Sequence, residues 1–440
     1  MHHSFFPLVN RRAHCILRVC ILRPAHQRRY SNQMVDQDQY IVGVPAEDIT
    51  LYTRGGYHPT HINDRFKEGR YEILNKLGFG SFSTVWLARD HQNNCNVSMK
   101  VVVADRSNSE KAELGILEHI EAKSDGQHPG RKHISRLLDS FYHDGPNGKH
   151  LCIVSELLGP KISTVAEKCT NYRLDSKLAR QVSRQLLLAV DYLHSCGVAH
   201  GDIHMGNILF RLSETERSSL KQIEGLGAPM TGEVSRKDGS PLEEGIPKYL
   251  VEPVEYNSKQ RTHIDEIQLV DFGESFFILT PQKSLYTPLS MHPPELVFRH
   301  TLSKAVDLWN LGSTTYELVT GRTPFEADFD EFVLIPQFQK VLGGVPDEWI
   351  RNAIKDGLLK DRPNDSAAEG FESLEEEIKR SYINGYDTST LQLGEEDFDV
   401  FGRYLRKLLV VDPIHRATTQ ELLQDAWVSD VEDIGAPGSE

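Results

Sequence analysis

The stretch that decides the fold of this 440-residue chain is His200-Gly201-Asp202-Ile203-His204-Met205-Gly206-Asn207. It places an aspartate and, five residues later, an asparagine in a turn-like run between an amphipathic helical segment and a short apolar strand. A carboxylate in such a position can orient and deprotonate an attacking hydroxyl, and a nearby amide oxygen can hold Mg²⁺. Asp202 is therefore a candidate catalytic base and Asn207 a candidate metal ligand.

A glycine-rich turn lies upstream of this stretch. The strand-like run 71–77 leads into the turn, and a second strand follows directly. A strand–loop–strand arrangement covers nucleotide phosphates with backbone amides, whereas a dinucleotide fold has a helix after the loop. Ser83 stands in the place of a third glycine, so the turn alone is also explained by a plain hairpin. The candidate nucleotide-binding positions here are Leu77, Gly78, Phe79, Gly80, Ser81, Phe82, Ser83, Thr84 and Val85.

The apolar strand 97–103 is interrupted by one lysine, Lys100. A lysine in such a run costs free energy unless it is paired or functional; the alternative is an edge lysine whose ammonium reaches solvent. The helix expected over 109–123 carries Glu113 on the same face as its apolar residues, while Glu118 lies off that face. We therefore predict an ion pair between Lys100 and Glu113.

A second apolar strand, 151–158, ends at Gly159-Pro160 and is expected to form a linker between two lobes. The backbone of Glu156 and Leu158 would hydrogen-bond an adenine ring. Ser155, a small residue, would leave room at the back of that pocket.

Three further motifs follow the catalytic stretch. The apolar strand 267–270 ends in Asp271-Phe272-Gly273, whose aspartate is the second candidate Mg²⁺ ligand. Met291-His292-Pro293-Pro294-Glu295 and Asp307-Leu308-Trp309-Asn310-Leu311-Gly312 come next. Glu295 is expected to pair with Arg416 in the core, because a buried carboxylate without a cation would be costly.

In this order the motifs make residues 71–428, about four-fifths of the chain, resemble a eukaryotic protein kinase. Within that superfamily the chain most resembles the serine/arginine-rich-protein kinases. Three runs carry this likeness: Tyr52-Thr53-Arg54-Gly55-Gly56-Tyr57-His58, the segment 77–88, and Glu156-Leu157-Leu158-Gly159.

The resemblance implies an α+β, two-lobed protein kinase fold. Its small lobe would be a mostly antiparallel sheet with one key helix, and its large lobe mainly helical. It also implies ATP and Mg²⁺ as cofactors, with Asp202, Lys100 and Glu113 as catalytic residues and Asn207 and Asp271 as metal ligands. The expected reaction is transfer of the γ-phosphate to serine or threonine of a basic or Arg/Ser-rich protein.

Three departures from the kinase pattern bear on rate and acceptor. Gly201 replaces an arginine that binds an activation-loop phosphate, so we expect no need for such a phosphate. His204 replaces a lysine that neutralises transferred charge, and a neutral imidazole would do this less well. The segment 286–291 lacks the expected threonine and tyrosine spacing.

Two other functions stay open at this point. A phosphotransferase of the aminoglycoside or choline kinase type, acting on a small molecule, is favoured by Gly201 and His204. An ATP-binding pseudokinase scaffold is the non-enzymatic alternative, and retention of Lys100, Asp202 and Asp271 argues against it.

The expected organisation has a basic leader before the kinase-like region and an insert within it. The segments are 1–34 (leader, similar in composition to a mitochondrial transit peptide), 35–70 (N-terminal extension), 71–158 (small lobe), 159–428 (large lobe, with a turn-rich insert over 212–263) and 429–440 (tail). A long irregular insert is typical of a regulatory segment.

Composition and charge limit the classes of partner that the chain is expected to bind. The leader holds six of the 49 basic residues and no acidic one, which leaves 43 basic against 63 acidic residues in the body. Such a body repels nucleic acid and suits basic partners, with Asp328, Asp330, Glu331 and 372–377 as candidate docking charges. The six cysteines show no zinc or disulfide spacing. We expect no membrane span and a monomer in the cytoplasm or nucleus, while the leader keeps a mitochondrial location open.

Overall fold

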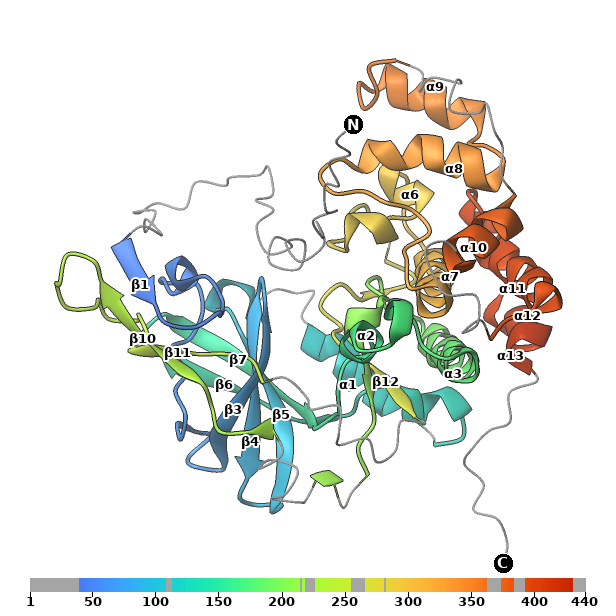
Figure 1. Ribbon diagram of the computed structural model, residues 1–440. Coiled ribbons are helices and arrows are strands. Elements are labelled where there is room, and N and C mark those ends of the chain that lie inside the picture. Colours follow the sequence, from blue (N-terminus) through green and yellow to red (C-terminus); the bar gives the residue numbers. More distant parts are fainter. Residues whose placement is uncertain are drawn as a thin grey trace, which may run out of the picture.

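The computed structural model describes residues 39–107, 113–124, 126–213, 216–217, 226–254, 266–280, 282–361, 373–383 and 392–429. The chain forms two lobes, one built on β-sheets and one mainly of helices (Figure 1). The expected leader lies outside the described residues, as does the expected tail except for Ser429.

The small lobe is built on an antiparallel sheet in the order β2-β3-β4-β5-β7-β6. Its strands are β2 (Arg65–Phe66), β3 (Tyr71–Gly80), β4 (Ser83–Asp90), β5 (Cys95–Val102), β6 (Leu137–Gly145) and β7 (Gly148–Glu156). Alternate residues of the central strands, among them Ile73, Trp86 and Met99, are buried in one apolar cluster, as the two-residue period of a strand requires. Helix α1 (Glu113–Lys123) buries Ile116 and Ile120 against the core of the other lobe. Residues 108–112, where the helix was expected to start, are not described.

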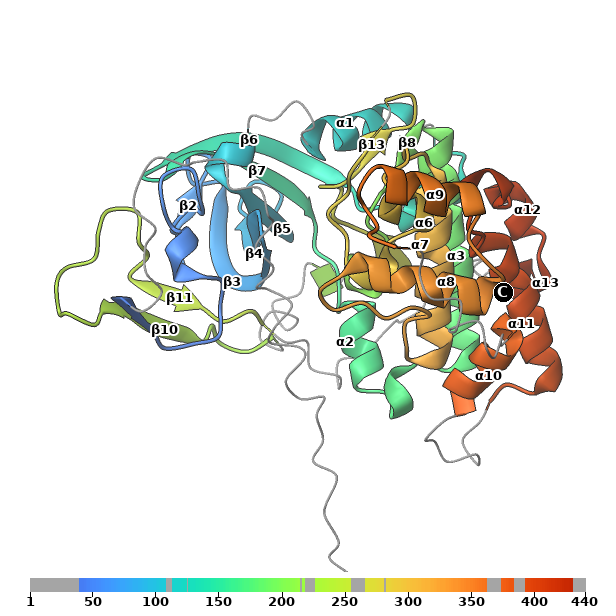
Figure 2. The same cartoon turned by 90° about the horizontal axis from the view of Figure 1, so that it is seen from above.

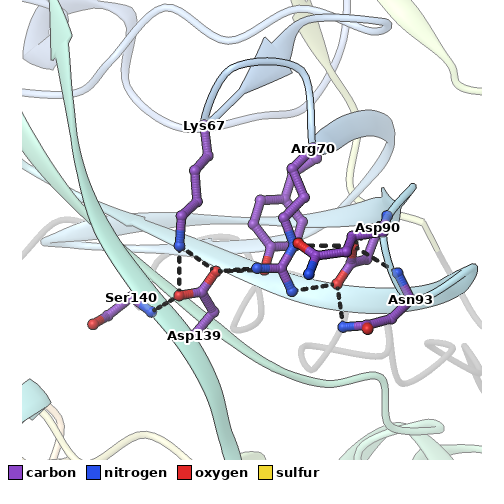
Figure 3. Close-up of polar contacts among 8 residues, drawn as sticks. Lys67, Arg70, Asp90, Asn93, Asp139 and Ser140 are labelled. Carbon is purple, nitrogen blue, oxygen red and sulfur yellow. Dashed lines mark hydrogen bonds and ion pairs between the residues drawn. The ribbon is translucent and has the colours of Figure 1, made fainter.

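A charged network holds the N-terminal end of β3, the end away from Gly80 (Figure 3). Lys67 donates to both carboxylate oxygens of Asp139 in β6, at 2.7 and 2.6 Å. Arg70 binds Asp90 through two nitrogens, at 3.1 and 2.8 Å, and Asp139 through a third at 3.0 Å. Asp90 also accepts from Asn93 at 2.9 Å. The network joins the β2–β3 turn to β6 and to the β4–β5 turn, so β3 is held firmly at this end.

A second, three-stranded sheet joins two segments that are distant in sequence. β1 (Tyr40–Val42), from the N-terminal extension, pairs with β10 (Thr231–Arg236), and β10 pairs with β11 (Tyr249–Val251). Figure 2 shows this sheet beside the strands of the small lobe. The described part of the insert is therefore more regular than the turn-rich segment expected. Because β10 buries only Gly232 and Val234, its sequence carries too little hydrophobic alternation to reveal a strand.

The large lobe surrounds a buried helix, α7 (Ala305–Thr320), in which every side chain except that of Glu317 is buried. Gly321 ends this helix in a left-handed conformation, with φ of 72°. The other helices are α2 (Ile162–Glu167), α3 (Ser176–Ser195), α6 (Pro294–Val297), α8 (Leu334–Leu342), α9 (Asp347–Lys355), α10 (Leu374–Ile383), α11 (Glu395–Leu408), α12 (Thr419–Leu423) and α13 (Ala426–Ser429).

Two short antiparallel ribbons hold the loops that carry the candidate site. β9 (Ile208–Phe210) pairs with β12 (Ile267–Leu269), and β8 (Val198–Ala199) pairs with β13 (Phe276–Phe277). The first ribbon brings the residues before β9 and those after β12 together, since the strands run in opposite directions. Asn207 and Asp271 are thus placed at one end of the same ribbon.

Candidate active site

The glycine-rich turn is a β-hairpin, as predicted, and no helix follows it. Gly78 lies opposite Val85 and Gly80 opposite Ser83. Ser83 is tolerated in place of a glycine because it lies within β4 and also pairs with Val102 of β5. A Cβ on Gly78 or Gly80 would meet no atom within 4 Å, so open space lies against this backbone. Of the other candidate positions, Leu77 and Phe79 lie in β3, Ser81 and Phe82 form the turn, and Thr84 lies in β4.

Lys100 in β5 lies between two carboxylates. Its Nζ is 2.7 Å from Oε2 of Glu113 in α1 and 2.8 Å from Oδ1 of Asp271. Burial disfavours the ammonium, but the two carboxylates outweigh burial and raise the pKa of Lys100 above its usual value. Lys100 in turn lowers the pKa of Asp271 to about 2. Lys100 and Asp271 therefore carry opposite charges at neutral pH.

Asp271 is exposed, whereas its neighbour Phe272 is buried in the core. Asp271 adopts a left-handed backbone conformation with φ of 65°, and its side chain is 49% exposed. Phe272 is buried, with its ring centre 5.0 Å from that of His200 in an edge-on contact. The buried ring thus fixes the position from which the Asp271 carboxylate faces outward.

Asp202 and Asn207 contact each other across the predicted loop. The Asn207 amide nitrogen donates to the Asp202 backbone oxygen at 2.9 Å and to its Oδ2 at 3.0 Å. This contact leaves the Asn207 side-chain oxygen available as a ligand. Oδ1 of Asp202 is buried and has no hydrogen-bond partner among the described residues. An unpaired buried carboxylate oxygen is costly unless a ligand completes it, so Asp202 has one acceptor position to offer.

Asp307 of α7 anchors the same loop from the core. Its carboxylate accepts from the backbone amides of His200 at 2.9 Å and Gly201 at 2.8 Å, and His194 lies 2.9 Å away. Burial alone would raise the pKa of Asp307, but these contacts hold that pKa below its usual value. His200, for which no role was predicted, is itself fully buried, and its Nδ1 accepts from the Asp202 amide at 3.2 Å.

Gly201 has no room for a side chain. Its φ of 82° lies in the left-handed region, and a Cβ would approach the backbone oxygen of Glu274 to 2.6 Å. Ser275, the next residue, donates from its hydroxyl to the His200 carbonyl at 3.0 Å. The segment after Asp271 therefore packs directly on the loop 200–207 at Gly201, the position that holds an arginine in the kinase pattern.

The rest of that segment is held by protein contacts. His292 lies 3.0 Å from Glu331 and 3.1 Å from the Thr287 carbonyl. Asn310 of α7 donates to the Met291 carbonyl at 2.7 Å. In the described residues of 271–295, these bonds and the β8–β13 ribbon hold the segment against the large lobe.

Glu274 is an ionisable group that the sequence did not single out. Burial raises the pKa of its carboxyl to about 7, and the nearby charge of Asp202 adds to the shift. Its Oε2 accepts from the Tyr286 amide at 2.9 Å. Glu274 thus places a carboxyl with a raised pKa close to Asp202.

His204 folds back over Gly206 instead of extending from the loop. Its Nδ1 accepts from the Gly206 amide at 3.0 Å, and its Nε2 lies 3.5 Å from Oδ2 of Asp202. A Cβ on residue 206 would lie 2.7 Å from His204 Cε1, so this imidazole position requires glycine there. With Nδ1 accepting, the proton-bearing nitrogen of a neutral imidazole is Nε2, which faces Asp202.

Replacing His204 by lysine is expected to preserve or raise kcat on serine peptides, because lysine brings a positive charge beside Asp202. The Gly206 amide would lose its acceptor, which should lower the free energy of unfolding by about 0.5–2 kcal/mol. His204→Ala is the control, since it loses the same acceptor and adds no charge. Peptide phosphorylation rates and urea unfolding measure the two effects. A collapse of kcat in both His204→Lys and His204→Ala would show that the imidazole has a role of its own.

The linker carries an ion pair that the sequence did not predict. Glu156, at the end of β7, has its side chain buried between Arg217 of the insert and Gln268 of β12. Its Oε1 accepts from Gln268 at 2.8 Å, and Arg217 binds the other oxygen. Only its backbone, and that of Leu158, can face a nucleotide. A glutamate in a linker gives no local sign of these partners.

The described part of the chain contains no cluster of three or more His, Cys, Asp or Glu side chains able to hold a metal ion. It also contains no helix that is both long and apolar enough to cross a bilayer.

The family model "Protein kinase domain" matches residues 71–225 and 256–428. The chain belongs to the protein kinase domain family. A crystal structure of a kinase domain superposes on 84% of this chain and 98% of its own length, with a TM-score of 0.60 at 18% identity. The two-lobed kinase fold predicted from the sequence is confirmed.

Named relatives of this kinase-family chain support the narrower resemblance. Serine/threonine-protein kinase SKY1 of Saccharomyces cerevisiae is 40% identical over 39% of this chain and 24% of its own length. Serine/threonine-protein kinase SRPK of Physarum polycephalum is 26% identical over 86% of this chain and 90% of its own. A serine/threonine protein kinase of Aspergillus fumigatus is 27% identical over 88% and 91%. The part of SKY1 that aligns with this chain is about a quarter of its length. Together these relatives confirm the resemblance to the serine/arginine-rich-protein kinases.

Proposed function

We propose that this chain is an ATP-dependent serine/threonine protein kinase that transfers the γ-phosphate to serine or threonine of protein substrates. The observation that carries the proposal is the unpaired, buried Oδ1 of Asp202. It lies on a loop that also holds Asn207, and the Lys100–Asp271 ion pair at 2.8 Å completes the charged set of the site. A hydroxyl that reaches Asp202 could give its proton to this oxygen as the phosphorus–oxygen bond forms.

The donor set fits Mg²⁺ bound together with a nucleotide. Asn207 and Asp271 offer an amide oxygen and an exposed carboxylate, and hard oxygen ligands of this kind suit Mg²⁺, which takes its remaining ligands from phosphate and water. With one carboxylate and one amide oxygen from the chain, the site would hold the ion chiefly through the phosphates. When bound, Mg²⁺ neutralises charge on the phosphates.

The other candidate residues bind the nucleotide or the acceptor. The hairpin amides over 77–85 lie along the phosphates, and Lys100 holds the α- and β-phosphates while Glu113 keeps its ammonium in place. The backbone of Glu156 and Leu158 binds adenine. Asp202 orients the acceptor hydroxyl and takes its proton. Because several hydrogen bonds hold the segment after Asp271, we propose that activity needs no phosphorylated residue there.

We further propose basic, Arg/Ser-rich proteins as substrates. The excess of acidic residues in the body supports this class. Some candidate docking charges already have partners within the chain: Glu331 binds Arg299, Glu375 binds Arg406 and Glu377 binds Arg380. Glu372 lies outside the described residues. Asp328 is exposed and forms no side-chain hydrogen bond or ion pair with the described residues, so it is a better docking candidate than these glutamates. A location in the cytoplasm or nucleus follows from this substrate class.

A comparison of acceptors tests the proposed function. The purified chain, with Mg²⁺ and radiolabelled ATP, is given an Arg-Ser repeat peptide, an Arg-Ala repeat control and a panel of amino alcohols and aminoglycosides. We expect label on the Arg-Ser peptide alone. Label on an amino alcohol would instead support the small-molecule phosphotransferase, the alternative that Gly201 and His204 favour. Nucleotide binding without transfer to any acceptor would support the scaffold.

A further inference from the structure

The N-terminal extension and the insert form one packed unit on the small lobe. They share the sheet β1-β10-β11 and a separate apolar cluster. The buried members of this cluster are Tyr40, Ile49, Tyr52, Tyr57, Val103, Val234 and Leu250. Val103 directly follows β5, the strand of Lys100, so the unit packs close to the candidate site. Figures 1 and 2 show its strands on the outer side of the small-lobe sheet.

A buried ion pair joins this unit to the glycine hairpin. Lys76, in β3 beside Leu77, is fully buried and pairs with Glu47 of the extension. Nζ of Lys76 also lies 5.4 Å from the ring centre of Phe79, a hairpin residue. The insert adds a backbone bond, since the Val254 amide donates to the Lys76 carbonyl at 2.9 Å. A buried ammonium needs such a partner, so β3 reaches its position only with the extension in place.

A direct contact to the hairpin comes from Tyr57. Its hydroxyl donates to the carbonyl of Gly80 at 2.6 Å, and the tyrosine is 3% exposed. Gly80 is the last residue of β3, next to the turn that would cover the phosphates. The Lys67–Arg70 network holds the N-terminal end of β3. Tyr57 restrains the C-terminal end, which leads into the turn that would cover the nucleotide.

Asn147, in the β6–β7 turn, couples the insert to Tyr57. Its side-chain amide donates to the Tyr57 carbonyl at 2.7 Å and to the Gly245 carbonyl of the insert at 2.9 Å. Its own carbonyl accepts from the Gly55 amide at 2.7 Å. Gly245 has a φ of 93°, and a Cβ there would lie 2.1 Å from Asn147 Oδ1. A change in the insert at Gly245 would therefore be transmitted to Tyr57.

We propose that the extension and the insert act as one unit that sets the position of the nucleotide-covering hairpin, with Tyr57 as a positioning residue for ATP. The inference rests on the proposed function of the site. It assigns the insert an effect on nucleotide affinity, exerted through Asn147, Tyr57 and Gly80 in turn. Substrate docking on the large lobe is not involved.

Tyr57→Phe tests the positioning role. It removes one hydroxyl, and loss of one hydrogen bond predicts about threefold to tenfold weaker binding of Mg·ADP and a similar rise in KM for ATP. We expect kcat and KM for the peptide to stay within about twofold, because Asp202 and its loop are not touched. Tyr40→Phe is the matched control: its hydroxyl donates to Glu243 at 2.7 Å in the same unit, away from the hairpin. This control should leave the nucleotide constants unchanged.

The coupling to the insert is tested by a double-mutant cycle with Gly245→Ala. Gly245→Ala should weaken Mg·ADP binding in the wild-type background and add little to Tyr57→Phe. If Gly245→Ala fails to fold, as judged by circular dichroism, Asn147→Asp takes its place in the cycle. Fully additive effects would overturn the coupling.

Calorimetric titration with Mg·ADP separates the inference from the proposed function, since it needs no turnover. A Tyr57→Phe protein with wild-type nucleotide affinity would overturn the inference and leave the kinase assignment intact. Failure of the wild-type chain to bind Mg·ADP would overturn both. A loss in Tyr40→Phe equal to that in Tyr57→Phe would assign the effect to general loosening of the unit and would also reject the positioning role.

Discussion

Asp202→Ala should reduce phosphoryl transfer to a serine peptide by at least about 10²–10⁴-fold while leaving nucleotide affinity almost unchanged. The reason lies in the separation of roles within the site. In the proposed mechanism the unpaired Oδ1 of Asp202 takes the proton of the acceptor hydroxyl, whereas Lys100, Glu113 and the hairpin backbone hold the nucleotide. Initial rates with an Arg-Ser peptide and calorimetric titration with Mg·ADP measure the two properties separately.

Asp271→Ala is the contrasting variant for this experiment. It removes a proposed Mg²⁺ ligand and one of the two carboxylates that contact Lys100. We expect it to weaken Mg·ADP binding and to lower the rate as well. Transfer that survives Asp202→Ala at near wild-type rates would remove Asp202 from the mechanism, whatever Asp271→Ala does.

The second large effect concerns stability. Glu295→Ala should lower the free energy of unfolding by about 3–5 kcal/mol, because it leaves the guanidinium of Arg416 buried without a counter-charge. Both side chains are at most 1% exposed, and two hydrogen bonds of 2.6 Å join them. Urea unfolding followed by circular dichroism measures the change.

A surface pair of the same geometry provides the control. Glu375 and Arg406 are also joined by two hydrogen bonds of 2.6 Å, but their side chains are 27% and 43% exposed. Glu375→Ala should therefore cost no more than about 1 kcal/mol. Equal losses in the two variants would mean that burial does not decide the strength of these pairs, contrary to the prediction.

Residues whose roles depend on local pattern could be predicted from the sequence. Glu113 was chosen as the partner of Lys100 because it shares a helix face with apolar residues, and the structure brings the two side chains to 2.7 Å. The hairpin followed from strand-like residues on both sides of the glycines. Predicting these features requires only the residue period of a helix or strand and the chemistry of the side chains.

Contacts between distant segments could not be predicted in this way. β1 pairs Tyr40 with Arg236, and nothing near either residue indicates the other. The partner of Lys76 is Glu47, which lies in a polar stretch with no motif. Glu156 was assigned to adenine through its backbone, while its side chain binds Arg217 and Gln268. In each case the decisive partner is set by the tertiary fold, and a single sequence carries no signal for it.

The left-handed backbone at Gly201 limits how control of this chain could change. The Cβ of an arginine at residue 201 would lie only 2.6 Å from the Glu274 carbonyl oxygen, and the residue would adopt a backbone conformation that arginine rarely adopts. One substitution could not therefore install a receptor for a phosphate on the neighbouring segment. Control by an upstream kinase would require changes in both the loop and that segment. A single substitution at Gly201 would therefore not make this chain dependent on phosphorylation of the neighbouring segment.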